Sequence, residues 1–388
     1  MKRTLFLITL IFFIIAFTSP AFIVTQRVAN ATVAPTINSP SAILIDEKTG
    51  DILWQKNADE RRAIASTTKI MTAILAIEKK SLDETVTVGE NVVLARENGM
   101  KLSPGEKIKL RDLLSALMLN SANDAAIAVA EYVGGSVEGF LGLMNQKALE
   151  LGAKNSNFTS PNGLINNHEL NSTAHFSTAR DLAIISRHAM KNKTFAAIVA
   201  TKEDTLTRDG SKPAVVINRN KLLWSYPGAN GIKTGHTNEA GYCLVSSAAK
   251  EGVSLIAVVL GSKSQDAVFD ESASLLNYGF AQFEQKKLVK KGAILKTIKL
   301  DYGQKLNLVA ESDVTATVRR SFKTFAKTDI KKNIKAPVKK GAVLGNLTIY
   351  QSDYPVAHVR LVADRGVKKP TFIQVIRFYW HRFLKRIY

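Results

Sequence analysis

Three short motifs bring together the residue types that could carry out serine acyl transfer. They occur in the order Ser66-Thr-Thr-Lys69, Ser121-Ala-Asn123 and Lys233-Thr-Gly235. A serine hydroxyl can act as a nucleophile, a nearby lysine amine can take its proton, and a Lys-Thr pair can hold a substrate carboxylate. The set therefore predicts an enzyme that forms a covalent acyl intermediate on Ser66.

Each motif alone is a weak signal, because the chain contains a second copy of each pattern. The copies are Lys48-Thr49-Gly50, Ser160-Pro-Asn162 and Ser247-Ala-Ala-Lys250. Lys48-Thr49-Gly50 lies between two strand-like runs, which is typical of a hairpin turn, and Lys250 follows a small-residue strand as an ordinary solvated end. The elements around the motifs must therefore separate function from coincidence.

A helix is expected directly after Ser66. The run Ile70-Met-Thr-Ala-Ile-Leu-Ala-Ile77 carries apolar residues on successive turns. Ser66 would then lie at the helix N-terminus with Lys69 on the same face, because positions i and i+3 are neighbours on a helix. The unpaired N–H groups of the first turn favour negative charge there. For this motif taken alone, the alternative is that Ser66 merely caps the helix.

The second motif is expected in a loop between two helices. Ser121-Ala-Asn123 follows the apolar residues 113–119 and precedes the Ala-rich residues 124–131. A loop in this position can direct a hydroxyl and an amide into a cleft. A polar turn with Asn123 or Asp124 as a cap is the alternative.

The third motif is expected on an exposed strand edge. Residues 227–231 form a turn-like stretch, and the strand would continue through Lys233-Thr-Gly-His-Thr237. Gly235 would let another backbone approach this edge closely. The N–H groups of the edge could then bind an oxyanion while Lys233, Thr234 and Thr237 hold a carboxylate. An ordinary polar edge strand is the alternative.

From about Pro35 to Lys369 the chain resembles the low-molecular-weight penicillin-binding proteins of the D-alanyl-D-alanine carboxypeptidase type. Besides the three motifs, the segments that carry the resemblance are Ala65-Ser-Thr-Thr-Lys-Ile-Met-Thr72, Leu102-Ser-Pro-Gly-Glu106, Ser160-Pro-Asn-Gly-Leu164, Ser177-Thr-Ala-Arg-Asp-Leu182 and Gly231-Ile-Lys-Thr-Gly-His-Thr237. It implies an α/β catalytic domain, with a central antiparallel sheet flanked by helices, followed by a small β-rich domain.

The resemblance also implies a reaction and a set of roles. Ser66 would attack the carbonyl between the two terminal D-alanines of a peptidoglycan stem peptide, and water would hydrolyse the acyl-enzyme. β-Lactams would acylate the same serine. Lys69 would accept the proton of Ser66, which requires a pKa lowered by burial and by Lys233. The remaining roles are a proton relay at Ser121, substrate amide binding at Asn123, carboxylate binding at Lys233, Thr234 and Thr237, and an oxyanion hole from the backbone N–H groups of Ser66 and His236, with Gly235 beside it.

Two other functions compete with this hypothesis. A class A β-lactamase shares the motifs but needs a Glu-x-x-Leu-Asn sequence, and Glu169-Leu-Asn171 lacks that spacing. Slow, long-lived acylation by penicillin is therefore expected. A wall-binding or structural protein could keep the fold with a dead site, but three intact motifs in order argue against it.

The N-terminus and the charge indicate an exported bacterial protein. Lys2 and Arg3 precede an apolar run, and Ala29-Asn-Ala31 provides a cleavage signal, so residues 1–31 are interpreted as a signal peptide. An uncleaved N-terminal anchor is the alternative. The formal net charge of +20 then favours anionic wall polymers and lipid headgroups at the outer face of the cytoplasmic membrane, and no nucleic-acid partner is expected.

The single Cys243 has no internal disulfide partner, and no Cys/His cluster has metal-ligand spacing, so neither a metal nor another cofactor is expected.

The chain after the catalytic domain changes in texture. The catalytic domain is expected over residues 35–283 and a β-rich domain over residues 286–367, with strand-like runs at 293–300, 343–349 and 356–362. The basic residues 319–340 are interpreted as a solvated face or loop, and contact with the cell wall is the alternative.

The last segment, residues 368–388, is predicted to be an amphipathic helix that lies in an anionic membrane surface. Its apolar residues form one broad stripe, apart from Phe378, which falls on the polar side. Its closing turns carry too much charge for a membrane span. A helix packed on its own domain is the alternative. The stripe consists of Phe372, Ile373, Val375, Ile376, Tyr379, Trp380, Phe383, Leu384 and Ile387, and the basic residues near it are Arg365, Lys368, Lys369, Arg377, Arg382, Lys385 and Arg386.

Overall fold

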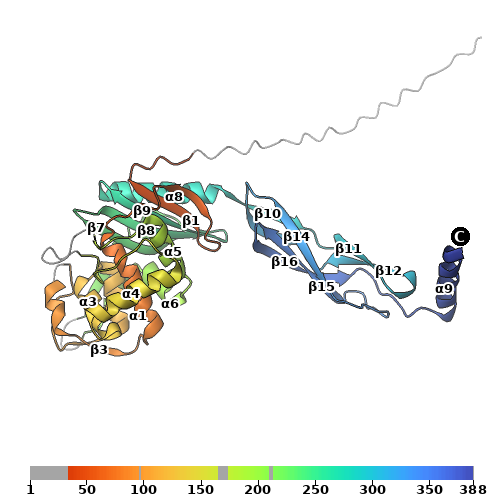
Figure 1. The fold of residues 1–388 in the computed structure, drawn as a ribbon, viewed down its shortest axis with the longest axis horizontal. Helices are drawn as coiled ribbons and strands as arrows, with labels where there is room; N and C mark the ends of the chain where they lie inside the picture. The colour runs from red at the N-terminus through yellow and green to blue at the C-terminus, as the bar shows by residue number, and fades with distance from the viewer. Residues whose placement is uncertain (1–33, 96–97, 165–173, 209–212, 388) are drawn as a thin grey trace, which may run out of the picture. The chain divides into compact units, whose positions relative to one another are not determined.

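The computed structural model describes residues 34–95, 98–164, 174–208 and 213–387. The predicted signal peptide lies outside the described residues. Two folded regions follow each other along the chain, an α/β region and a β-rich region (Figure 1).

A five-stranded antiparallel sheet forms the centre of the α/β region. Its strand order is β2-β1-β9-β8-β7, so β7 lies at an edge, as predicted for the strand of the third motif. The predicted hairpin around Lys48-Thr49-Gly50 is also confirmed, because β1 pairs with β2. The strands are β1 (Ser41–Asp46), β2 (Ile52–Lys56), β7 (Ala229–Thr237), β8 (Gly241–Lys250) and β9 (Val253–Ser262).

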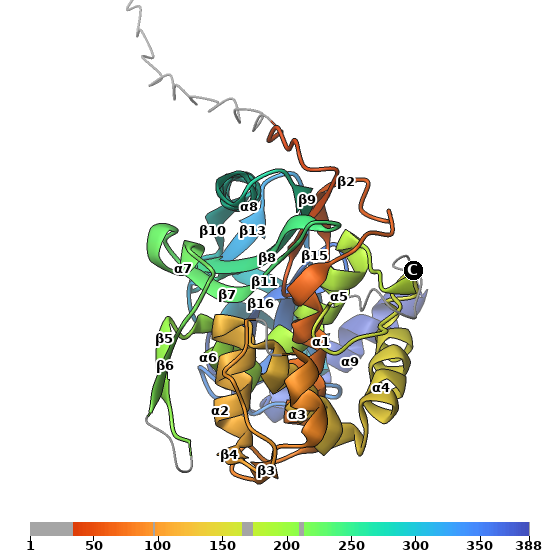
Figure 2. The same ribbon diagram turned by 90° about the vertical axis from the view of Figure 1, so that its left-hand side faces the viewer.

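Helices cover both faces of this sheet, since its central strands are apolar on both sides. Helix α8 (Gln265–Ala281) packs on one face, and α1, α5 and α6 pack against the other (Figure 2). The other helices of this region are α2 (Leu110–Ser115), α3 (Asn123–Gly134), α4 (Val137–Leu151) and α7 (Leu222–Ser225), while α1, α5 and α6 span Lys69–Lys79, Ala179–Met190 and Lys193–Ala200.

Shorter elements complete the α/β region. Two small antiparallel pairs are formed by β3 (Thr85–Thr87) with β4 (Lys107–Lys109) and by β5 (Glu203–Leu206) with β6 (Ala214–Ile217). The 3₁₀ turns η1 (Ala65–Thr68) and η2 (Glu90–Ala95) and the π-helical turn η3 (Ala116–Asn120) lie between the helices. None of the described helices is by itself long and apolar enough to cross a membrane, and α3 with α4, bent by 83°, meets those criteria only as a pair.

The β-rich region contains a five-stranded sheet of order β11-β12-β16-β15-β14 and a separate pair, β10 with β13. Its apolar core includes Leu306, Leu308 and Leu361. All three predicted strand-like runs are strands here. The elements are β10 (Phe283–Val289), β11 (Ile294–Lys299), η5 (Asp301–Gly303), β12 (Lys305–Ala310), β13 (Val314–Arg319), β14 (Thr324–Ile330), β15 (Val343–Gln351) and β16 (Tyr354–Ala363).

The basic residues 319–340 are not a continuous loop. The sequence predicted either a loop or a solvated face, and the prediction of a loop is wrong for β14, which pairs with β15 along its whole length. Most of the β14 side chains are exposed, as a solvated face requires. The C-terminal segment is a helix, α9 (Phe372–Ile387), as predicted.

Candidate active site

Ser66 lies in the 3₁₀ turn η1, immediately before helix α1. Lys69 is the first residue of α1, and its Nζ lies 2.8 Å from Ser66 Oγ. The residue before Ser66, Ala65, has a φ of +46°, a left-handed backbone conformation that is uncommon outside glycine. The N-cap of α1 is Thr68, with no side-chain capping bond, so Ser66 is not the helix cap. The predicted Ser66–Lys69 juxtaposition is confirmed.

Lys69 joins the first motif to the second. Its Nζ lies 2.8 Å from Asn123 Oδ1 and 3.4 Å from Ser121 Oγ, as well as 2.9 Å from the carbonyl oxygen of Asn162. Ser121 itself has a φ of +64°, which turns the chain between η3 and α3 and directs the motif at Lys69. Asn162 was not predicted as a site residue. It lies in Ser160-Pro-Asn162, the second copy of the Ser-x-Asn pattern. The spacing of that copy did not indicate that it lies beside Lys69.

Burial controls the charge state of the two site lysines. Burial is the main reason why the pKa of Lys69 lies well below its usual value. The positive charges of Lys233 and Arg219 lower this pKa further, and the negative charge of Asp124 opposes them. Burial and then Arg219 lower the pKa of Lys233 to about 7. Within the described part of the chain, Lys233 Nζ has no hydrogen-bond partner. Lys69 can therefore be neutral and accept a proton, and Lys233 can receive an anionic group.

Strand β7 passes very close to the nucleophile turn at Gly235. A β-carbon on Gly235 would lie 3.0 Å from the Ser66 nitrogen and 3.1 Å from both the Thr67 nitrogen and the Ile64 oxygen. Only glycine fits such a backbone approach without displacing the strand. The close backbone approach expected at Gly235 is present, and β7 brings the backbone of the third motif beside the backbone N–H of Ser66.

An open cavity of about 310 Å³ lies over these groups. His236 is exposed at this cavity, and its ring stacks on Tyr242 with 4.1 Å between the ring centres. Thr237 does not line the cavity; its Oγ1 accepts a hydrogen bond from the Ala240 N–H in the turn after β7. The lining residues are Ser66, Asn98, Ser121, Asn123, Leu164, Arg219, Thr234, Gly235, His236, Tyr242, Cys243, Gln265, Val268 and Phe269.

Arg219 is a cavity residue that sequence reasoning missed. It lies in the loop between β6 and α7, and its guanidinium donates to Asn120 Oδ1 at 3.3 Å. Its charge acts on both buried lysines. A single arginine in a loop has no distinctive spacing, so only the folded structure identifies it.

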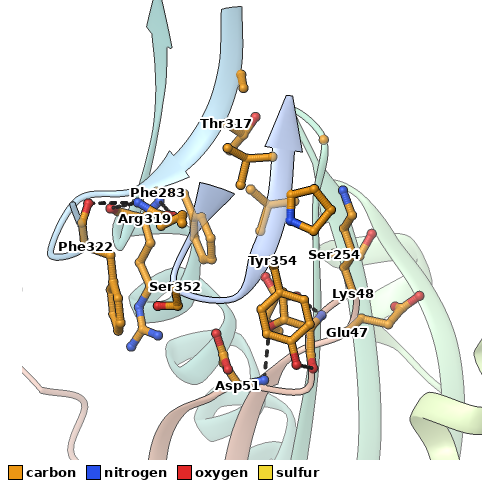
Figure 3. Close-up of a pocket in the computed structure, with 18 of the residues that line it drawn as sticks. Glu47, Lys48, Asp51, Ser254, Phe283, Thr317, Arg319, Phe322, Ser352 and Tyr354 are labelled. Carbon is orange, nitrogen blue, oxygen red and sulfur yellow. Dashed lines mark hydrogen bonds between the residues drawn. The ribbon is translucent and has the colours of Figure 1, made fainter. Parts of the chain in front are cut away.

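A larger pocket of about 570 Å³ lies elsewhere and contains none of the predicted site residues (Figure 3). Its wall includes Glu47, Asp51, Arg319 and Tyr354 (Figure 3). The Tyr354 hydroxyl donates to the Thr49 carbonyl oxygen at 3.0 Å. Pocket size therefore does not identify the reactive site in this protein. Across the described residues, no group of three or more His, Cys, Asp or Glu side chains could hold a metal ion.

Comparison with known proteins agrees with this geometry. Residues 28–264 match a family model described as D-alanyl-D-alanine carboxypeptidase. The chain belongs to the D-alanyl-D-alanine carboxypeptidase family. Residues 283–369 match a second model, described as the penicillin-binding protein 5 C-terminal domain. The family resemblance and the fold class expected from the sequence are both confirmed.

Curated members of the carboxypeptidase family align over almost the whole chain. DacF of Bacillus subtilis is 32% identical over 97% of this chain and 97% of its own length. DacC of Escherichia coli is 35% identical over 93% of this chain and 91% of its own. The crystal structure of DacD from Francisella tularensis is 30% identical, with a TM-score of 0.63 over 92% of this chain and 100% of that one. Penicillin-binding protein 5 from Haemophilus influenzae is 31% identical, with a TM-score of 0.61 over 86% and 99%.

Proposed function

We propose that this protein is a serine-type D,D-carboxypeptidase that removes the terminal D-alanine from peptidoglycan stem peptides. The observation that carries the proposal is the contact of 2.8 Å between the buried Lys69 Nζ and Ser66 Oγ. A nucleophile with an adjacent base of lowered pKa is the arrangement that acyl transfer requires. Family membership narrows the substrate to a peptide that ends in D-alanyl-D-alanine.

Acylation begins with proton transfer from Ser66 to the neutral amine of Lys69. The Ser66 oxygen forms a bond to the carbonyl carbon, and the electron pair of the C=O bond moves onto the oxygen. Backbone N–H groups of Ser66 and His236 would stabilise this oxyanion, and one such donor is worth about a hundred- to a thousandfold in rate. The oxyanion then re-forms the carbonyl, and the C–N bond breaks.

The leaving amine must receive a proton as the C–N bond breaks. Lys69 holds the proton taken from Ser66, and Ser121 Oγ lies 3.4 Å from Lys69 Nζ. Ser121 would therefore relay this proton to the amine, which departs as free D-alanine. Water then attacks the acyl carbonyl carbon while Lys69 accepts a proton from it, and the ester bond to Ser66 breaks as Lys69 returns that proton to Ser66 Oγ, which releases the shortened peptide.

Groups that line the cavity or lie next to it would orient the substrate. The terminal carboxylate would bind the ammonium of Lys233 and the hydroxyl groups of Thr234 and Thr237, while the side chain of Asn123 would bind the substrate amide. Gly235 keeps β7 close to Ser66, which supports placement of the scissile carbonyl at the nucleophile. β-Lactams, which present a carboxylate and a strained amide, would acylate Ser66 in the same orientation.

Hydrolysis of β-lactams should be slow. A class A β-lactamase activates its deacylating water with a glutamate, and the sequence holds no Glu-x-x-Leu-Asn match. Glu169-Leu-Asn171, which lacks the required spacing, lies outside the described residues. A non-catalytic wall-binding role is disfavoured because the first two motifs meet at the buried Lys69 and the third lies beside the Ser66 nitrogen.

The activity is tested with the purified protein and its Ser66→Ala variant. Each is incubated with a peptide that ends in D-alanyl-D-alanine, and free D-alanine is measured over time. Release by the parent alone supports the proposal. Equal release by both proteins would exclude Ser66 as the nucleophile, and no release by a folded parent would exclude the activity.

We infer that the protein is exported and held at the outer face of the cytoplasmic membrane by α9, with residues 1–31 as signal peptide and 35–283, 286–367 and 368–388 as functional units. The helix presents bulky apolar side chains to solvent at helical spacing, which is unfavourable in water and suits a lipid interface. These side chains are Phe372, Ile373, Ile376, Tyr379, Trp380, Phe383 and Leu384. Basic residues on the same helix would favour anionic headgroups.

Single aspartates on α9 test this attachment. Ile376→Asp and Trp380→Asp lie on the exposed apolar stripe, and His381→Asp, which introduces the same side chain off the stripe, is the matched control. We expect the first two to lower binding to phosphatidylglycerol vesicles about tenfold and the control to lower it less. Equal binding by all three variants and the parent would contradict the inference.

A further inference from the structure

A buried histidine lies behind the nucleophile turn and has no part in the proposed reaction. His175 is only 2% exposed, and its ring packs edge-on against Phe158, with 6.0 Å between the ring centres. Its Nε2 lies 2.8 Å from Thr68 Oγ1. Thr68 belongs to η1, the turn that carries Ser66, so the histidine reaches the nucleophile turn from a segment more than one hundred residues away in sequence.

The hydrogen bonds of His175 determine which of its nitrogens carries the proton. The backbone N–H of Thr159 donates to Nδ1 at 3.1 Å, so Nδ1 is an acceptor. A neutral imidazole then has its hydrogen on Nε2, which donates to Thr68 Oγ1. Burial lowers the pKa of His175 to about 4, which keeps this neutral form at working pH.

The chain of hydrogen bonds ends at the residue before the nucleophile. With its oxygen accepting from His175, the Thr68 hydroxyl donates its own hydrogen to the Ala65 carbonyl oxygen at 2.8 Å. Ala65 is not a glycine, yet its backbone has the left-handed conformation. This conformation costs about 1 kcal/mol or more and persists only when neighbouring groups enforce it. The Ala65 carbonyl is thus held by a defined donor on the side of Thr68.

Gly163 packs directly against the same carbonyl group. Its φ is +85°, and a β-carbon there would overlap the Ala65 oxygen and lie 2.9 Å from Thr68 Oγ1. The Ala65 peptide therefore has little room to rotate. The Ala65 carbonyl and the Ser66 N–H belong to one planar peptide group, so holding the carbonyl also sets the direction of this N–H.

We propose that His175 is a positioning residue that acts through Thr68 on the Ala65–Ser66 peptide and so fixes the nucleophile and its oxyanion-binding N–H. The proposal rests on the proposed role of Ser66. His175 touches neither the substrate nor the reacting atoms. Its loss should slow the chemical step of acylation and leave the initial noncovalent binding of a ligand intact, because the cavity walls are unchanged.

The test measures acylation of the full chain by a fluorescent penicillin in stopped flow, which separates noncovalent binding from the rate constant of acylation. His175→Phe keeps a ring but removes both hydrogen bonds, Thr68→Val keeps the side-chain shape but removes the hydroxyl, and His175→Gln keeps an N–H donor. We expect acylation to be about 10- to 100-fold slower in the first two, with unchanged noncovalent binding, and within about fivefold of the parent in His175→Gln.

A control separates this effect from general destabilisation. Phe140→Leu truncates a fully buried side chain on α4, in the same core but away from the nucleophile turn, and should lower the melting temperature without slowing acylation. The proposal is overturned if folded His175→Phe or Thr68→Val is acylated within twofold of the parent rate, or if Phe140→Leu is slowed as much as they are. A parent that no penicillin acylates would instead refute the proposed function itself.

Discussion

Replacing Gly235 with alanine should separate strand β7 from the nucleophile turn. The new β-carbon would lie 3.0 Å from the Ser66 nitrogen and 3.1 Å from the Thr67 nitrogen and the Ile64 oxygen, where ordinary contacts begin at 3.4 Å. All three neighbours are backbone atoms, so no side-chain rotation relieves the contacts. The two backbones must therefore move apart by roughly 0.4 Å, which is the difference between 3.0 and 3.4 Å.

This displacement acts on the part of the site where geometry controls rate. A misplacement of about 1 Å can cost about a hundredfold, and loss of one oxyanion donor costs about a hundred- to a thousandfold. Scaled in proportion in free energy, a shift of roughly 0.4 Å predicts about a sixfold loss of acylation rate, or about 1.1 kcal/mol of transition-state stabilisation, and a larger loss where the oxyanion N–H is also displaced. Gly235 lies in regular strand β7, outside the left-handed region, so backbone strain adds little to this effect.

The assay compares Gly235→Ala with Gly142→Ala for penicillin acylation and for D-alanine release. Gly142 lies in helix α4, and a β-carbon there would meet no atom within 4 Å. The control should keep the parent rate and gain up to about 1 kcal/mol of stability, because alanine favours a helix. A folded Gly235→Ala protein that is acylated at the parent rate would refute the close-approach reasoning.

Three further predictions concern charge and stability. Lys233, with a pKa of about 7, is charged below that pH, so kcat/KM for a D-alanyl-D-alanine peptide should fall above pH 7, and Lys233→Arg should move this basic limb beyond about pH 9. The pKa of His175 is about 4 in the folded protein and 6.5 in the unfolded chain, so the free energy of unfolding should decrease by about 3 kcal/mol as the pH falls from 6.5 to 4. Urea titrations measure this decrease, and it should be smaller in His175→Gln. Glu271 accepts hydrogen bonds from the backbone N–H groups of Asn38 and Ser39 at 2.7 and 3.1 Å. Glu271→Ala should therefore lower stability by about 2 to 4 kcal/mol and the melting temperature by about 5 to 10 °C, and an unchanged melting curve would contradict this anchoring role.

Local spacing made part of the site predictable from sequence. Ser66 and Lys69 are three residues apart at the start of one helix, and this proximity is fixed by helix geometry. The edge position of β7 also followed from a turn before the strand and polar residues along it. Each of these predictions needed only interactions within about ten residues.

The parts that sequence did not reveal depend on long-range contacts. Asn162 meets Lys69 across 93 positions, and His175 meets Thr68 across 107. A loop carbonyl or a buried histidine has no periodic pattern, so nothing in the sequence indicates its partner. Strand β14 was missed for a related reason, since an exposed basic strand lacks the apolar alternation that marks a half-buried one.

Phe378 shows how the structure resolves an imperfect pattern. It falls outside the apolar stripe of α9, which made the helix look irregular. Its ring packs edge-on against Tyr302, with 5.8 Å between the ring centres, and the neighbouring stripe residue Tyr379 contacts the same ring at 6.2 Å, while most of the bulky stripe residues are exposed. Phe378 therefore has a packing role on Tyr302 within the protein, which explains why an apolar residue lies outside the stripe.

The surroundings of Lys69 explain how one side chain can both take and return a proton. Burial and two nearby cations favour the neutral amine, which is the form that accepts the proton of Ser66. Asn123 Oδ1 and the Asn162 carbonyl, at 2.8 and 2.9 Å, favour the ammonium once it has formed. If either influence were removed, the lysine would remain in one state: exposed, it would keep its proton at neutral pH, and without its acceptors it would not take the proton of Ser66. The buried position and the oxygen acceptors are therefore joint requirements of a single acid–base group.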